Sequence, residues 1–366
     1  MAAKKTASKK TPAKKKPAKK TPAKKKIVLV TGASGFIAKH CIVRLLNAGY
    51  AVRGSLRTPN RADEVRAAIA TKAPQASTDD LTFVTLDLMS DDGWDAAVKG
   101  CTFVQHIASP FPDAEPDDEN DLIVPAREGA LRAVRTAAKA GVKRVVLTSS
   151  MAAIAYGHDN GSDYEYSEKD WSNSDGDIGA YLKSKTIAER AAWDFMETPK
   201  AGKMQLSVIN PGAVLGPLLD ATYSTSGELV RKLLAGEVPA CPDLGFACID
   251  VRDVADAHFN AMVMPVAAGR RYLLVDSYAK MLDISKCLYE AGYKTPTKKL
   301  PNFVVHILAI FDKTVRMIKG GLGKHENTSN ERLREELGID PRSIKEMSQS
   351  MAETMVEYGV VTPKMR

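Results

Sequence analysis

The feature that most constrains this sequence is an apolar strand that runs directly into a glycine-rich turn and then into a helix. The residues IVLV at 27–30 are apolar and mostly β-branched, which is typical of a strand buried on both faces. The turn TGASGFIA at 31–38 follows at once, and apolar residues then recur at helical spacing. A glycine pair alone is weak evidence. Placed here, it predicts a turn that binds the pyrophosphate of a dinucleotide at a helix N-terminus.

Each small residue of this turn has a predicted task. Gly32 allows the chain to turn tightly, and Gly35 lets the backbone approach the pyrophosphate. Ala38 occupies the position where the helix packs closely against the strand.

Strands and helices continue to alternate after this unit. The patterns predict strands at 51–57, 81–87, 101–108, 142–150 and 205–210, and helices near 60–71, 121–140 and 178–197. This alternation predicts an α/β protein with a doubly wound parallel sheet of the Rossmann type.

Three domains are predicted from the changes in composition along the chain. Residues 1–26 form a low-complexity lysine, alanine and proline tail that we expect to be disordered. Residues 27–215 form the dinucleotide-binding domain. Residues 216–366 form mainly a smaller substrate lobe, with segments that return to the first domain, because ligands bind at the carboxyl edge of such sheets.

The end of the second predicted strand indicates which dinucleotide binds. An NAD site places an acidic residue there for the ribose hydroxyls, whereas this strand offers Arg53 and Arg57. A guanidinium pairs well with a 2′-phosphate, so NADP(H) is the predicted cofactor, and Arg57 is nearer the strand end. Two solvated arginines would give the same pattern. Asp87, which ends the third strand, either accepts a hydrogen bond from the adenine amino group or caps the following loop.

A tyrosine and a lysine are the predicted catalytic residues. Tyr181 and Lys185 are four residues apart on a predicted helix, so both side chains lie on one face. We expect the ammonium to lower the phenol pKa toward neutrality, since a free phenol titrates near ~10. The pair also occurs by chance on helix surfaces. Ser149 and Ser150, at the end of the fifth strand, offer a hydroxyl for the developing negative charge of a carbonyl oxygen, and only one of them should face the crevice.

The net charge of +8 has a local origin. The first 26 residues contain twelve lysines and no acidic residue, and the rest of the chain has 40 Lys+Arg against 44 Asp+Glu. A lysine tail binds polyanions such as nucleic acid without sequence preference, or is simply solvated. The five cysteines are scattered without a spacing typical of zinc sites, which predicts free thiols and a cytoplasmic location. No apolar run is long enough to span a membrane.

Several motifs in order resemble those of the extended short-chain dehydrogenases/reductases. They are TGASGFIAKH, VQHIASPF, VVLTSSMAA, YLKSK, INPGAVLGP, IDVRDVADAH and RLREELGID. The sequence is most similar to the group of dihydroflavonol 4-reductase, cinnamoyl-CoA reductase and methylglyoxal reductase. The resemblance runs from Ile27 to the C-terminus.

This resemblance implies an NADP(H)-dependent enzyme that reduces a carbonyl group to an alcohol. It assigns catalysis to Ser150, Tyr181 and Lys185, with Tyr181 protonating the carbonyl oxygen. It implies a cofactor site that includes Tyr181 and Lys185 together with Gly32, Gly35, Phe36, Ile37, Arg57, Asp87, Leu88, Ala108, Ser109, Pro211 and Val214.

Two other functions fit parts of the sequence. Relatives with this fold use NAD for nucleotide-sugar epimerisation or dehydration, but Arg57 stands where they carry an acid. A nucleic-acid-associated protein that only senses its cofactor is supported by residues 1–26 alone. We expect a small-molecule carbonyl substrate, no metal, no membrane partner, and a monomer or homodimer.

Overall fold

A computed structural model describes residues 25–71, 78–110, 116–161, 163–305 and 321–366. The predicted disordered tail falls almost wholly outside these ranges, so its structure and its contacts remain predictions. Within the described part of the chain, no helix is both long and apolar enough to cross a membrane.

The centre of the molecule is a seven-stranded sheet in which every neighbouring pair is parallel. Its order is β10-β7-β5-β4-β1-β2-β3. The strands are β1 Ile27–Val30, β2 Ala51–Leu56, β3 Leu81–Thr85, β4 Cys101–His106, β5 Arg144–Thr148, β7 Gln205–Pro211 and β10 Arg270–Leu274. From β1 the chain first adds β2 and β3 on one side and then β4, β5, β7 and β10 on the other. Such sheets open a ligand crevice where the direction of winding changes, next to β1. The predicted doubly wound fold is confirmed.

The sequence patterns located six of these strands and missed the seventh. β10 (RRYLL) lies in the stretch predicted to be mainly substrate lobe and pairs with β7, so this part of the chain does return to the sheet. The predicted strands at 51–57, 81–87 and 101–108 were too long by one or two residues at the carboxyl end, because there the chain leaves the ladder for the loops that line the crevice, and the strand predicted at 142–150 was too long by two residues at each end.

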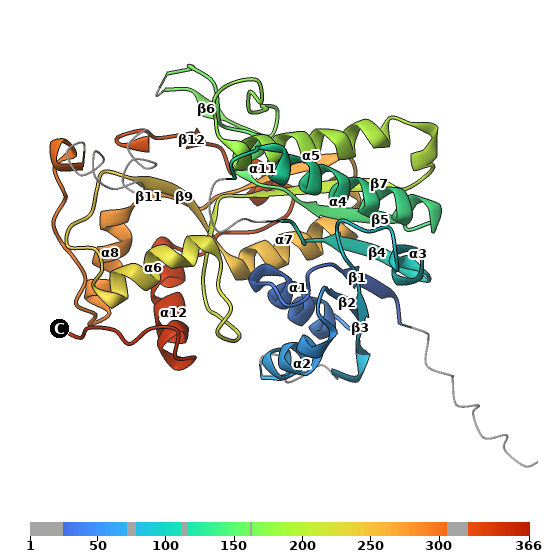
Figure 1. Ribbon diagram of the computed structural model, residues 1–366, viewed down its shortest axis with the longest axis horizontal. Coiled ribbons are helices and arrows are strands. Elements are labelled where there is room, and N and C mark those ends of the chain that lie inside the picture. Colours follow the sequence, from blue (N-terminus) through green and yellow to red (C-terminus); the bar gives the residue numbers. More distant parts are fainter. Residues whose placement is uncertain (1–24, 72–77, 111–115, 162, 306–320) are drawn as a thin grey trace, which may run out of the picture.

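Helices cover both faces of the sheet (Figure 1). One layer contains α3 (Trp94–Val98), α4 (Asn120–Lys139) and α5 (Ala180–Met196). The other contains α1 (Phe36–Asn47), α2 (Ala62–Ala70) and α7 (Val251–Val263). The buried alanines of α4 and α5 allow these two helices to pack closely above β4, β5 and β7. Short 3₁₀ turns occur at Pro59–Arg61, Thr78–Asp80, Met151–Ala153, Pro199–Ala201 and Pro265–Ala267.

A second lobe lies beside the carboxyl edge of the sheet. Its three-stranded sheet, in the order β11-β9-β8, is formed by β8 (Ala213–Leu215), β9 (Gly245–Asp250) and β11 (Ser277–Lys280). The described helices of this lobe are α6 Thr225–Ala235, α8 Met281–Glu290, α11 Glu331–Glu335 and α12 Ile344–Glu357. A small parallel pair, β6 (Glu165–Tyr166) and β12 (Asn327–Thr328), closes its upper side in Figure 1.

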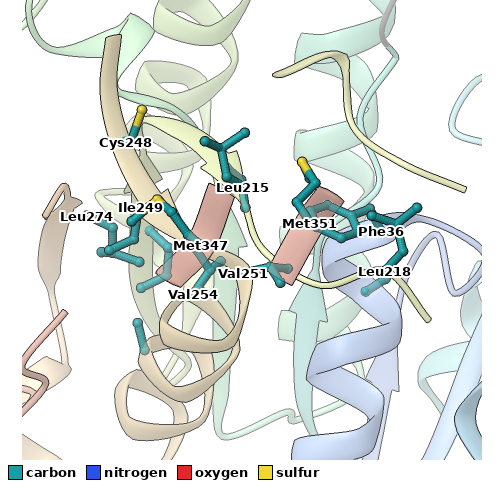
Figure 2. Close-up of a cluster of buried hydrophobic side chains, with 14 of the residues drawn as sticks. Phe36, Leu215, Leu218, Cys248, Ile249, Val251, Val254, Leu274, Met347 and Met351 are labelled. Carbon is teal, nitrogen blue, oxygen red and sulfur yellow. The ribbon is translucent and has the colours of Figure 1, made fainter. Parts of the chain in front are cut away.

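The two lobes share one apolar core, which Figure 2 shows in close-up. Phe36 at the start of α1 belongs to the same cluster as Leu215 of β8 and Met351 of α12. Gly212 allows the backbones to approach where the chain passes from β7 into the second lobe, because a Cβ there would lie 2.1 Å from the Ala247 carbonyl oxygen. The second lobe is therefore held firmly against the edge of the sheet where the glycine turn lies.

Candidate active site

A cavity of about 600 Å³ opens at the carboxyl ends of the central strands. Every residue that the sequence predicted for the cofactor or for catalysis lines it. These residues are Gly32, Gly35, Phe36, Ile37, Arg57, Asp87, Leu88, Ala108, Ser109, Ser150, Tyr181, Lys185, Pro211 and Val214. The carboxyl ends of parallel strands meet at one edge, and this is why residues far apart in sequence gather here.

The glycine turn adopts a backbone that other residues tolerate poorly. Gly32 has φ +69°, and a Cβ on it would lie 3.1 Å from Cα of Ala108. The Gly32 N–H donates to Oγ of Ser55 at 3.1 Å, which fixes the turn against β2. Gly35 is the residue before α1 and makes no side-chain cap, so the helix begins with its N-terminus at the cavity. This geometry suits a phosphate.

A buried threonine that the sequence reasoning missed holds the end of β4 beside this turn. Oγ1 of Thr31 accepts hydrogen bonds from the N–H groups of Ile107 and Ala108 at 2.9 and 3.0 Å. It also lies 3.0 Å from Nδ1 of His106, whose pKa burial lowers to about 4. Thr31 therefore fixes the backbone that brings Ala108 and Ser109 to the cavity wall.

The structure separates the two arginines of β2. Arg53 donates to the carbonyl oxygens of Ala97 and Lys99 at 2.5 and 3.0 Å, so its guanidinium is committed to the end of α3. Arg57 is exposed and lines the cavity. Asp87 lines it as well, while its Oδ1 accepts from the N–H of Met89 at 2.8 Å. Asp87 therefore caps the loop that follows β3, and it also lies at the cavity, where an adenine amino group could donate to its carboxylate.

Ser150, Tyr181 and Lys185 all line the first cavity. The Ser150 side chain hydrogen-bonds Tyr181, and its Oγ accepts from the Ala152 N–H at 3.1 Å. Lys185 Nζ donates to Oγ of Ser109 at 2.8 Å and lies 5.6 Å from the centre of the Tyr181 ring. The four-residue spacing on α5 places tyrosine and lysine on one face, as the sequence predicted.

The electrostatics of this group differ from the sequence prediction. Burial raises the pKa of Tyr181 above its ordinary value, and the hydrogen bond with Ser150 opposes that shift. Burial also lowers the pKa of Lys185 to about 8, so its ammonium is itself destabilised. The expected lowering of the phenol pKa by lysine is therefore not found in the protein alone, because desolvation outweighs a charge several ångströms away.

The two serines at the end of β5 have different surroundings. Ser150 lines the first cavity and also a second one, whereas Ser149 lines only the first. Oγ of Ser149 is buried and has no hydrogen-bond partner among the described residues. This geometry favours Ser150 as the serine that faces the substrate.

The second cavity, of about 360 Å³, meets the first one at Ser150 and Tyr181. Its wall comes from the second lobe and from the turn after β5, and the sequence reasoning identified few of these residues. They include Met151, Tyr156, Leu215, Thr225, Ser226, Leu229, Gly245, Phe246, Cys248, Ile284 and Glu326. Most of them lie on β8, β9, α6 and α8 of the second lobe, and only Met151 and Leu215 fall within the motifs quoted above, so no motif marked the others.

A buried ion pair supports the carboxyl end of β5. Arg271 of β10 donates to Oε1 of Glu189 at 2.6 Å, and both side chains are almost inaccessible to solvent. Asn210 donates from Nδ2 to the other carboxylate oxygen at 2.6 Å and to the Ser150 carbonyl oxygen at 3.1 Å. The pair therefore connects α5, β7 and β10 to the backbone of Ser150.

Comparison with known proteins identifies the family. The model of the NAD dependent epimerase/dehydratase family matches residues 28–274, which ends at the last residue of β10. The chain belongs to this family. The match begins in β1 and spans the complete seven-stranded sheet.

Several relatives within this family are reductases. Cinnamoyl-CoA reductase CAD2 of Medicago truncatula is 35% identical over 283 residues, covering 75% of this chain and 82% of the relative. NADPH-dependent methylglyoxal reductase GRE2 of Saccharomyces cerevisiae is 30% identical, covering 90% and 98%. The crystal structure of yeast methylglyoxal/isovaleraldehyde reductase Gre2 with NADPH superposes with a TM-score of 0.74, at 28% identity, and covers 92% of this chain and all of that one. The resemblance stated from the motifs is confirmed.

Proposed function

We propose that this chain is an NADPH-dependent reductase that converts a small aldehyde, ketone or ketol to an alcohol, with Ser150, Tyr181 and Lys185 as its catalytic residues. One observation carries the assignment of residues: Ser150 and Tyr181, whose side chains are hydrogen-bonded, line both the first and the second cavity, together with Gly212, Thr225 and Ser226. A carbonyl placed at that junction contacts both hydroxyls. The relatives named above, which include NADPH-dependent reductases, support the reaction type.

The first cavity fits NADPH. The glycine turn and the N-terminus of α1 line this cavity, and free N–H groups at a helix start suit a pyrophosphate. Arg57 would bind the 2′-phosphate, and Lys185 the nicotinamide ribose. When bound, NADPH supplies a hydride for the carbonyl carbon.

The chain's own residues would control the proton and the charge on oxygen. Ser150 donates to the carbonyl oxygen as negative charge develops there, and Tyr181 gives that oxygen its proton. The hydrogen bond between the two side chains already aligns them. A phenol is protonated at neutral pH, so Tyr181 carries the proton, but burial raises its pKa and the phenolate must be stabilised for that proton to leave. Lys185 would stabilise the phenolate that remains.

The neighbouring serines allow a matched test of these roles. Ser150→Ala should lower kcat for aldehyde reduction by roughly 10²-fold, which is the usual cost of losing one donor to a developing oxyanion. Ser149→Ala should lower it by much less, because Ser149 does not line the second cavity. Steady-state kinetics at saturating NADPH separates the two variants. Equal losses in both would show that the assignment to Ser150 is wrong.

Cofactor choice depends on Arg57 in this proposal. Arg57→Ala should raise the Kd for NADPH by about tenfold or more and leave the Kd for NADH nearly unchanged, because only NADPH carries the 2′-phosphate. Arg53→Ala is the control, since that guanidinium is bonded to the end of α3. Fluorescence titration measures both constants. Similar losses for the two cofactors would mean that Arg57 does not recognise the phosphate.

The second candidate function, NAD-dependent epimerisation or dehydration of a nucleotide sugar, is less favoured. Arg57 occupies the place of the acidic residue that binds both ribose hydroxyls of NAD. Copurification of tightly bound NAD without NADPH oxidation by any carbonyl compound would reverse this preference.

We also propose that the enzyme works in the reducing environment of the cytoplasm. All five cysteines are free thiols, and four of them are buried. Burial raises the pKa of the thiols of Cys41 and Cys248, which makes them poorly reactive packing residues.

A further inference from the structure

The second cavity contains one charged side chain among the described residues that line it. That residue is Glu326, while the rest of the wall is apolar or carries neutral hydroxyl and thiol groups. The carboxylate has no hydrogen bond or ion pair with any other described residue. Glu326 is half-buried, and an ionised carboxylate only accepts hydrogen bonds. Its presence therefore carries information about what enters the cavity.

The segment that carries Glu326 is held on both sides. The carbonyl oxygen of Lys324 accepts from Oη of Tyr278 at 2.6 Å, and the ring of His325 lies 3.9 Å from the ring of Tyr278. On the other side β12 pairs with β6, and the Ser329 N–H donates to the Tyr166 carbonyl oxygen at 2.9 Å. The backbone at Glu326 is thus fixed relative to the cavity wall.

The charge of Glu326 acts on aromatic residues on this side of the lobe. Burial raises the pKa of Tyr156, and the charge of Glu326 adds to that shift. The same charge contributes to the raised pKa values of Tyr166 and Tyr278. Tyr156 lines the cavity together with Tyr181, so one continuous wall joins the catalytic hydroxyl to the carboxylate.

We propose that Glu326 selects the substrate: it accepts a hydrogen bond from a hydroxyl or amine located away from the reacting carbonyl, and it disfavours substrates that carry an anionic group. This inference rests on the proposed function and narrows its substrate class. The preferred substrates are neutral or cationic carbonyl compounds with a remote hydrogen-bond donor. The cavity volume of about 360 Å³ is at the lower end for small-molecule sites, so these compounds are small.

Matched aromatic aldehydes test the proposal. Hydroxymethylbenzaldehyde offers a donor, ethylbenzaldehyde has the same shape without one, and formylbenzoate is an anion. The meta and para isomers of each provide two separations from the carbonyl. In the wild type, kcat/KM should be roughly tenfold higher with the hydroxymethyl compound than with the ethyl compound, because only the former donates a hydrogen bond to the charged carboxylate, and it should be lowest with formylbenzoate, which the carboxylate repels.

Two substitutions then separate charge from hydrogen bonding. Glu326→Gln should raise kcat/KM for formylbenzoate by about tenfold or more and change that for ethylbenzaldehyde little. Glu326→Leu should remove the preference for the hydroxymethyl compound. Glu165→Gln is the control. Glu165 is an exposed carboxylate on β6 that pairs with Asn327 in the strand register, and its substitution should leave kcat/KM unchanged for all three classes of aldehyde. An unaltered order of substrates in both Glu326 variants would overturn the proposal.

A binding measurement keeps this test independent of turnover. The Kd values of benzenedimethanol and ethylbenzyl alcohol for the NADPH-saturated protein report the same preference without any reaction. Absence of turnover with every aldehyde would contradict the proposed function. The role of Glu326 would be contradicted if the wild type bound the two alcohols with equal Kd values, or if Glu326→Leu kept the preference of the wild type for benzenedimethanol.

Discussion

Replacing Tyr181 with phenylalanine should lower kcat/KM for carbonyl reduction by a factor on the order of 10³, which is the middle of the range for general acid catalysis. The substitution removes the hydroxyl that protonates the carbonyl oxygen and keeps the ring that packs at the start of α5. Steady-state NADPH oxidation with a neutral aldehyde measures the loss.

The control for this prediction is cofactor binding. NADPH should bind Tyr181→Phe with a Kd within about threefold of the wild type, because the glycine turn and Arg57 are untouched. The fold should be preserved as well, since the Ser150 Oγ keeps its contact with the Ala152 N–H. Turnover that survives in the variant would show that another group supplies the proton.

The second large effect is expected on stability. Arg271→Met should lower the free energy of unfolding by about 3–5 kcal/mol, because it leaves the Glu189 carboxylate buried without its counter-charge. Arg271 also donates to the Asp170 carbonyl oxygen at 2.6 Å and lies with its guanidinium carbon 3.8 Å from the centre of the Trp171 ring. Urea unfolding measures the change, as a lower midpoint concentration with an unchanged dependence of the free energy on urea concentration.

A surface ion pair provides the matched control for this substitution. Arg334 pairs with Asp340, whose side chain is 86% exposed, so Arg334→Met should cost less than about 1 kcal/mol. Replacing Glu189 and Arg271 together with methionine should recover part of the stability lost in the single variant. Equal small effects of Arg271→Met and Arg334→Met would contradict the role given to the buried pair.

Local patterns were sufficient for the fold and for much of the site. The glycine turn and the tyrosine–lysine spacing are short-range signals, and parallel strands then bring them to one edge. β10 was missed because RRYLL begins with two arginines and follows an irregular stretch. Arg271 is nevertheless buried there, because Glu189, 82 residues away, supplies the compensating charge. A pairing over that distance has no local signature.

The substrate cavity could not be predicted for the same physical reason. Glu326 reaches it only because β12 pairs with β6, which is far away in sequence. The pKa of Tyr181 was predicted in the wrong direction because spacing along a helix says nothing about desolvation. Sequence patterns place a residue on an element, whereas its burial depends on every element that packs around it.

The central claim is that this chain moves hydride from NADPH to a carbonyl carbon with Tyr181 as the acid. The most direct measurement uses NADPH with deuterium at both C4 positions, a neutral aldehyde, and mass spectrometry of the product. The account predicts an alcohol that carries one deuterium on the carbinol carbon, formed at the rate of NADPH consumption by the wild type and almost absent with Tyr181→Phe. An alcohol without deuterium, or no alcohol from any aldehyde or ketone with the wild type, would contradict it.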